Sequence, residues 1–139
     1  MTITGLPLHP LVVHAVVVLL PLMALLTVLV AVRPAWRVKA WWVVVGNALV
    51  AGASLLAKES GESLQASLGG QVAREHGELG EVLPWFAVAL LVTSAALALL
   101  RSRRTPALVS AVVTVVAAVA AVWWTVRTGD SGARAVWQR

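Results

Sequence analysis

The chain contains no cysteine and few charged residues, and both shortages restrict its class. Without cysteine there can be no disulfide framework, no thiolate nucleophile and no cysteine-held metal cluster. Charged residues make up only 12% of the 139 residues, whereas about a quarter is typical of soluble domains. Hydrophobic residues make up 60%. This composition excludes an ordinary soluble domain and favours a membrane protein.

Familiar catalytic and nucleotide-binding motifs are also absent from the sequence. It has no hydrolase triad pattern, no P-loop, no dinucleotide fingerprint and no zincin motif, so the sequence does not decide whether the protein is an enzyme. The formal net charge is +5, but the basic residues lie between hydrophobic runs and form no basic face. A nucleic-acid partner is therefore not expected.

Four hydrophobic runs are long enough to cross a lipid bilayer, which takes about 20 mostly apolar residues per helix. The predicted spans cover residues 10–32, 40–57, 82–100 and 106–126. Helices joined by short links pack as antiparallel neighbours. The sequence therefore predicts an all-α membrane protein in which residues 1–139 form one domain. Its fold should be an antiparallel up-and-down four-transmembrane-helix bundle.

Tryptophans and small residues predict how this bundle meets lipid and other helices. Trp41 and Trp85 lie near the ends of their runs, as interfacial anchors do. Gly46 and Gly52 on the second span suggest close helix packing, either within the bundle or between the subunits of a homo-oligomer.

The distribution of charge predicts one orientation in the membrane. The links 33–39 and 101–106 carry six Lys and Arg residues and no acid, while all six acids lie towards the other side. By the positive-inside rule both links should be cytoplasmic, which places both termini outside.

All three histidines fall at the predicted outer end of the bundle. His9 and His14 lie in the first turns of span 1, and His76 precedes span 3. Ionisable groups at membrane depth are costly, so they mark functional sites by default.

The stretch 59–81 between spans 2 and 3 carries helical spacing and is predicted to be an outer-side helical segment. The segment should break at Gly69–Gly70, where two glycines interrupt the helical pattern. Helix 3 should then begin near Gln71, turn His76 towards the bundle interior, and bend near Pro84.

Three motifs resemble a known family: "GLPLHPLVVH" opens the chain, "HGELGE" precedes span 3 and "TGDSGARAVW" closes it. Over essentially the whole chain they resemble small four-helix proteins of the bacterial cytoplasmic membrane, grouped as domain of unknown function 2231. That family has been suggested to be related to b-type cytochromes, and some relatives look fused to iron–sulfur domains. The resemblance therefore implies redox chemistry, by association alone.

Three family residues carry over to this chain, namely His9, His14 and His76. One position departs from the family pattern. Asp130 stands where family members commonly have histidine within "GHSGA". Any site that required that fourth histidine is altered here.

Two cofactor hypotheses follow. In the first, His14 and His76 are the axial ligands of haem b, with His9 in a supporting role, and the protein passes electrons to a membrane redox partner. In the second, a histidine and carboxylate cluster binds or handles zinc, copper or iron. Its candidate ligands are His9, His14, His76, Glu59, Glu62 and Asp130. The alternative to both is a non-catalytic structural or oligomeric membrane scaffold.

The predicted orientation can be tested with two cysteine substitutions in intact cells. A cysteine at Ser67 should react with a membrane-impermeant thiol reagent added outside, because the acid-rich end faces outwards. A cysteine at Ser102, in the basic link, should react only after the cells are opened. Labelling of both from the same side would contradict a shared outer polar end.

Overall fold

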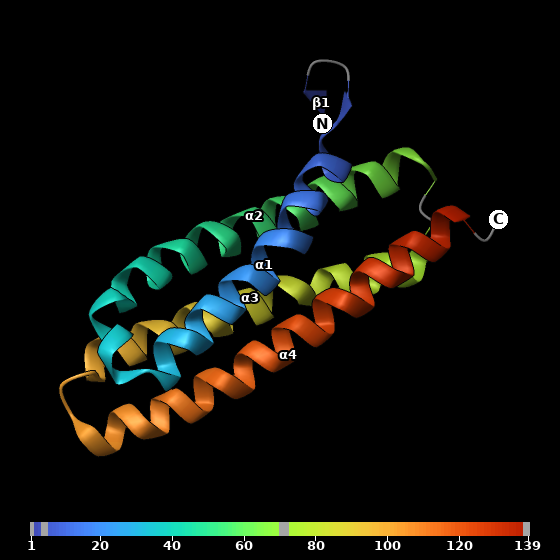
Figure 1. The fold of residues 1–139 in the computed structure, drawn as a ribbon. Helices are drawn as coiled ribbons and strands as arrows, with labels where there is room; N and C mark the ends of the chain where they lie inside the picture. Colours follow the sequence, from blue (N-terminus) through green and yellow to red (C-terminus); the bar gives the residue numbers. More distant parts are fainter. Residues whose placement is uncertain (1, 4–5, 70–72, 138–139) are drawn as a thin grey trace.

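The computed structural model describes residues 2–3, 6–69 and 73–137, and its four long helices form one bundle (Figure 1). All four are long and apolar enough to span a bilayer, which confirms the predicted fold class. The helix α1 packs against α2 and α4, and α3 packs against the same two, so α1 and α3 lie across a diagonal. The helix bounds are α1 Leu8–Val32, α2 Ala40–Ser67, α3 Arg74–Leu100 and α4 Arg104–Trp137.

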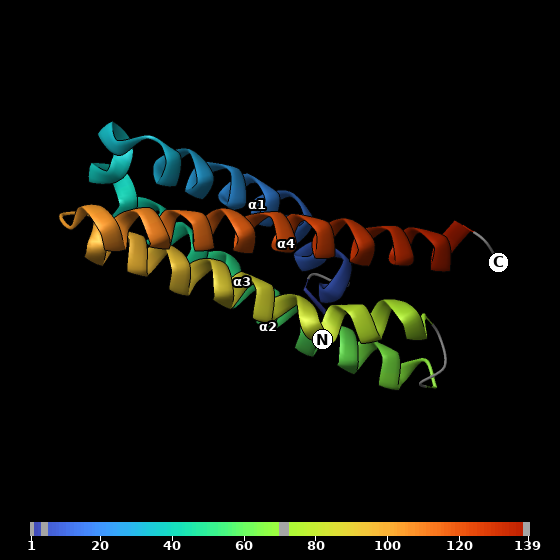
Figure 2. The same ribbon diagram turned by 90° about the horizontal axis from the view of Figure 1, so that it is seen from below.

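Two short elements on either side of α1 were not expected from the sequence. The strands β1 (Thr2–Ile3) and β2 (Leu6–Pro7) pair in antiparallel register before α1 begins. The 3₁₀ helix η1 (Pro34–Lys39) connects α1 to α2. Its proline lies at the start of the helix, where the missing amide hydrogen costs nothing. Figures 1 and 2 both show η1 and the α3–α4 link at one end of the bundle, with the C-terminus at the other.

The helical character expected for residues 59–81 appears as extensions of α2 and α3. The helix α2 continues to Ser67 and then ends. Gly69, just beyond it, has a φ of +84°, a backbone conformation that favours glycine. The helix α3 begins at Arg74 and runs through Pro84 without interruption. The expected start near Gln71 lies outside the described residues, and the bend at Pro84 stays a prediction.

The two hairpins α1–α2 and α3–α4 repeat one pattern of buried positions. Buried residues of α1 and α3 form pairs whose two members are always separated by the same number of residues in the sequence. These pairs are Val16/Leu83, Leu20/Ala87, Thr27/Ser94, Val30/Leu97 and Ala31/Ala98. A second constant spacing relates α2 to α4, in the pairs Ala40/Ala111, Val43/Thr114, Asn47/Ala118, Val50/Ala121, Ser54/Thr125, Ala57/Thr128 and Ser60/Ser131. The bundle is therefore an approximate two-fold repeat of one helical hairpin.

Asn47 lies in the buried core where the two hairpins meet. Its Nδ2 donates to Thr27 Oγ1 at 3.0 Å and to Ser94 Oγ at 3.1 Å, the two hydroxyls that the repeat makes equivalent. One amide thus joins α1, α2 and α3, while its Oδ1 has no partner among the described residues. The position equivalent to Asn47 is Ala118, also buried, on the opposite helix α4.

The repeat predicts that an asparagine on α4 can replace the hydrogen bonds that Asn47 makes from α2. Asn47→Ala should lower the free energy of unfolding by about 1 kcal/mol, because two interhelical hydrogen bonds are lost at ~0.6 kcal/mol each. Adding Ala118→Asn should restore most of that loss, since the repeat relates Ala118 to Asn47 and Thr27 to Ser94. The measurement is unfolding of the purified variants by a denaturing detergent.

The matched control places the second asparagine at Ala120, which the repeat does not align with Asn47. Asn47→Ala combined with Ala120→Asn should stay as unstable as Asn47→Ala alone. Equal rescue by both second substitutions would mean that the two hairpins are not equivalent at this position.

Candidate functional site

His9 lies in the first turn of α1 and contacts the last turns of α2. Its Nδ1 is 3.0 Å from the carbonyl oxygen of Ala57 and 3.4 Å from Ser60 Oγ. The imidazole lies directly over Gly61, where an added Cβ would be only 2.8 Å from Cε1 of His9. Glycine is therefore what allows the ring to approach α2 this closely.

His76 repeats this arrangement in the second hairpin. It lies in the first turn of α3, and its Nδ1 is 3.0 Å from the carbonyl oxygen of Thr128 and 3.3 Å from Ser131 Oγ on α4. An added Cβ at Gly132 would be 3.0 Å from both Cε1 and Nδ1 of the ring. His76 is half-buried and helical, so the expected inward orientation is confirmed. The repeated acid–Ser–Gly sequences are Glu59-Ser60-Gly61 and Asp130-Ser131-Gly132.

The two imidazoles meet between the hairpins and form what we call the His9–His76 pair. Their ring centroids are 6.1 Å apart, with an angle of 69° between the ring planes. A carbonyl oxygen can only accept a hydrogen bond, so each Nδ1 carries a proton and donates it. In the neutral form of each ring, Nε2 then keeps its lone pair.

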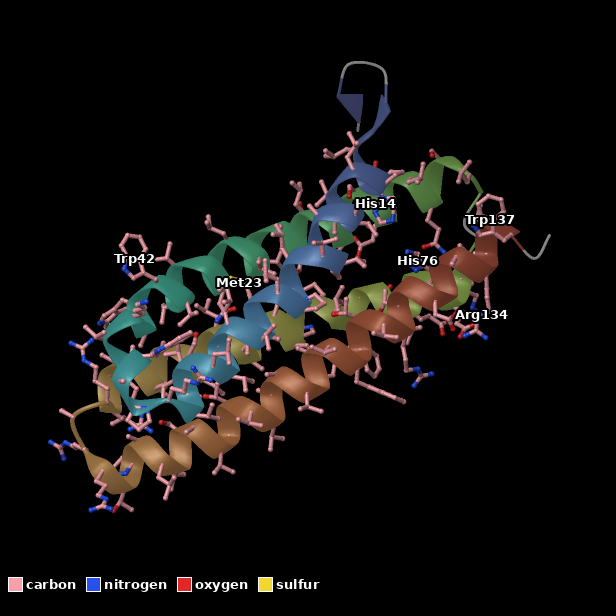
Figure 3. The ribbon with its side chains drawn as sticks, in the orientation of Figure 1. His14, Met23, Trp42, His76, Arg134 and Trp137 are labelled. Atoms are coloured by element: carbon pink, nitrogen blue, oxygen red, sulfur yellow. The ribbon has the colours of Figure 1, made fainter. Side chains whose placement is uncertain are left out.

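His14 is not part of this pair. It is exposed, and its Nδ1 lies 2.5 Å from the carbonyl oxygen of Pro10, one turn earlier in α1. The expectation that His14 faces His76 across the bundle is wrong, because His14 is five residues after His9 and therefore about 140° around the helix. Figure 3 shows His14 and His76 towards the same end of the molecule, on different helices.

The carboxylates also lie outside the pair. Glu62 pairs with Lys58 at 2.7 Å, Glu78 pairs with Arg74 at 3.0 Å, and Asp130 pairs with Arg134, each within its own helix. Glu59 is exposed. In the part of the chain that the structure describes, no three His, Asp or Glu side chains are placed to hold a metal ion. The six-residue metal cluster considered above is therefore not assembled.

The room beside His76 comes from a glycine on α4 and not from its neighbour in the chain, Gly77. Gly77 faces the side chain of Gln65, because an added Cβ would lie 2.9 Å from Oε1 of that residue. Gly132 on α4 is the glycine that accommodates the His76 ring. One turn further along α3, the carbonyl oxygen of Leu79 accepts a hydrogen bond of 2.9 Å from Nε1 of Trp124 on α4.

A donor set of two imidazoles suits haem iron better than a bare metal ion. Zinc sites use three or four protein ligands, whereas haem iron takes only its axial ligands from the protein. His9 and His76 would hold the iron, and the centroids of their rings are 6.1 Å apart. A ligating histidine commonly donates its other N–H to a carbonyl, as both rings do here. The donor chemistry of these two residues therefore fits haem iron.

These features define a four-helix membrane bundle with two equivalent histidines at one end. Over residues 5–139 the chain matches the family model described as "Predicted membrane protein (DUF2231)". The match covers nearly the whole chain, and the protein belongs to this family, as its three motifs indicated. No curated protein and no solved structure shows significant similarity to it.

The close approach of His9 to α2 predicts a specific effect of substituting Gly61. Gly61→Ala should push the imidazole away from Ala57 and lower the free energy of unfolding by about 1 kcal/mol, the usual contribution of one hydrogen bond. The ¹⁵N chemical shift of His9 Nδ1 reports the loss of that bond directly. Gly129→Ala is the control, because nothing lies within 4 Å of its added Cβ and alanine favours helix. An unchanged His9 signal in Gly61→Ala would contradict this account of the site.

Proposed function

We propose that this membrane protein binds haem b between His9 and His76 and takes part in electron transfer. One observation carries the proposal. Two half-buried imidazoles from diagonally opposed helices lie edge to face with their ring centroids 6.1 Å apart, and each Nδ1 is bonded to a main-chain carbonyl. Two protein ligands are enough for a haem iron, whereas a metal ion without haem needs three or four. The suggested relation of the family to b-type cytochromes agrees with this choice.

The residues around the pair prepare both rings for ligation. The carbonyls of Ala57 and Thr128 hold each imidazole in the tautomer whose Nε2 lone pair is free to bind iron. Gly61 and Gly132 let the rings lie close against α2 and α4, which fixes their orientation. Iron with two imidazole ligands supplies reversible one-electron transfer.

The proposal places the site at the outer face of a bacterial cytoplasmic membrane. Six Lys and Arg residues in the two links lie at the opposite end of the bundle from the histidines. This asymmetry supports a cytoplasmic location for the links and an outer location for the His9–His76 pair.

A membrane scaffold is the second candidate function, and the same hydrogen bonds favour it. His9 joins α1 to α2, and His76 joins α3 to α4, at the polar end of each hairpin. Such bonds stabilise the bundle without any cofactor. A metal-handling role has weaker support, because the described carboxylates are engaged elsewhere or exposed.

The proposal is tested by the colour and metal content of four purified proteins. The parent, His9→Ala, His76→Ala and His14→Ala are expressed with iron and a haem precursor supplied. The parent and His14→Ala should show the Soret band of bound haem. His9→Ala and His76→Ala should lose that band, because each removes one axial ligand.

The variants should remain in the membrane, since the apolar helices alone suffice for insertion. A parent without haem or metal under these conditions overturns the proposal and leaves the scaffold as the leading function. Haem that persists in both His9→Ala and His76→Ala would place the site elsewhere in the protein.

A further inference from the structure

An apolar groove opens between α3 and α4 near the basic end of the bundle, far from the histidines. Its volume is about 430 Å³, within the usual range of ligand sites. It is lined by Thr93, Ala96, Leu100, Pro106, Val109 and Val113, among others. Five of these six side chains are hydrophobic, so the groove suits a hydrocarbon chain.

The mouth of the groove is strongly basic. Leu100 and Thr105, which line it, flank the link that carries Arg101, Arg103 and Arg104. All three arginines are exposed, and none forms an ion pair within residues 2–3, 6–69 and 73–137. The first turn of α4 contains no acidic residue. This end of the groove therefore attracts an anion, helped by the positive end of the α4 dipole.

The two-fold repeat allows the lining of the groove to be compared with the first hairpin. Thr93, Ala96 and Val113 line the groove, and the equivalent positions in the first hairpin hold larger residues. These are Leu26, Leu29 and Trp42. The smaller residues at these three positions of α3 and α4 leave room for the groove.

We propose that the α3–α4 groove binds an anionic phospholipid. One acyl chain lies along Ala96 and Val109, and the phosphodiester is held at Arg101, Arg103 and Arg104. Arginine suits this role because its guanidinium donates two parallel hydrogen bonds to a phosphate group. A single ligand that is apolar along its length and anionic at one end matches both features of the site.

The test compares lipid binding to the detergent-solubilised full-length protein by native mass spectrometry. The probes are dioleoylphosphatidylglycerol, dioleoylphosphatidylcholine and soluble glycerol phosphate. The parent should bind the phosphatidylglycerol most tightly, because only that probe supplies both the acyl chains and the net negative charge. Equal competition by glycerol phosphate would reduce the site to a phosphate site and overturn the lipid proposal.

Two matched double variants separate the site from general attraction by positive charge. Arg101→Gln/Arg103→Gln should weaken phosphatidylglycerol binding roughly 30-fold. Arg33→Gln/Lys39→Gln removes the same charge from the other link and should leave binding near that of the parent. Equal losses in both variants would show non-specific electrostatic binding and overturn the proposal.

A third variant tests the groove itself with side chains that the fold already accepts. Thr93→Leu/Ala96→Leu installs the residues found at the equivalent positions of α1. It should abolish the preference for phosphatidylglycerol while leaving the unfolding midpoint unchanged. Lipid binding that survives in this folded variant would place the acyl chain elsewhere.

Discussion

Polar groups buried in a lipid-spanning bundle can find hydrogen-bond partners only within the bundle, and this constraint organises the structure. Buried hydroxyls on all four helices donate to carbonyls one turn earlier, as Ser54 and Thr125 do to Val50 and Ala121. Asn47 cannot be satisfied within its own helix, so it bonds across to two hydroxyls on α1 and α3. At the polar end the two histidines are likewise satisfied by carbonyls of the neighbouring helix.

The same repeat that brings Thr27 and Ser94 to one amide also brings His9 and His76 to each other. Each histidine begins the first helix of its hairpin and bonds to the end of the second. Two hairpins packed about an approximate two-fold axis then place equivalent side chains on opposite sides of that axis. The proposed ligand pair is thus a consequence of how the two hairpins pack against each other.

Hydropathy and length were enough to predict the four helices and the polar end, because lipid demands long apolar runs. The pairing of His9 with His76 could not be predicted, since the repeat is carried by burial and not by identity, as Asn47/Ala118 and Val43/Thr114 show. Two signals were nevertheless present in the sequence. The repeated acid–Ser–Gly sequence marks both contact points, and the four-residue spacing of Asp130 and Arg134 indicated a local ion pair.

A chain made of two equivalent hairpins has a freedom that two separate hairpins lack. Identical hairpins assembling as a dimer would carry the same residue at both related positions, so an asparagine on the axis would face its own copy. Joining the halves in one polypeptide permits an amide at one position and a methyl group at the equivalent position, as with Asn47 and Ala118. The covalent connection thereby allows the two hairpins to differ in sequence, and the lining of the α3–α4 groove, with Thr, Ala and Val where the first hairpin has Leu, Leu and Trp, is one example of that asymmetry.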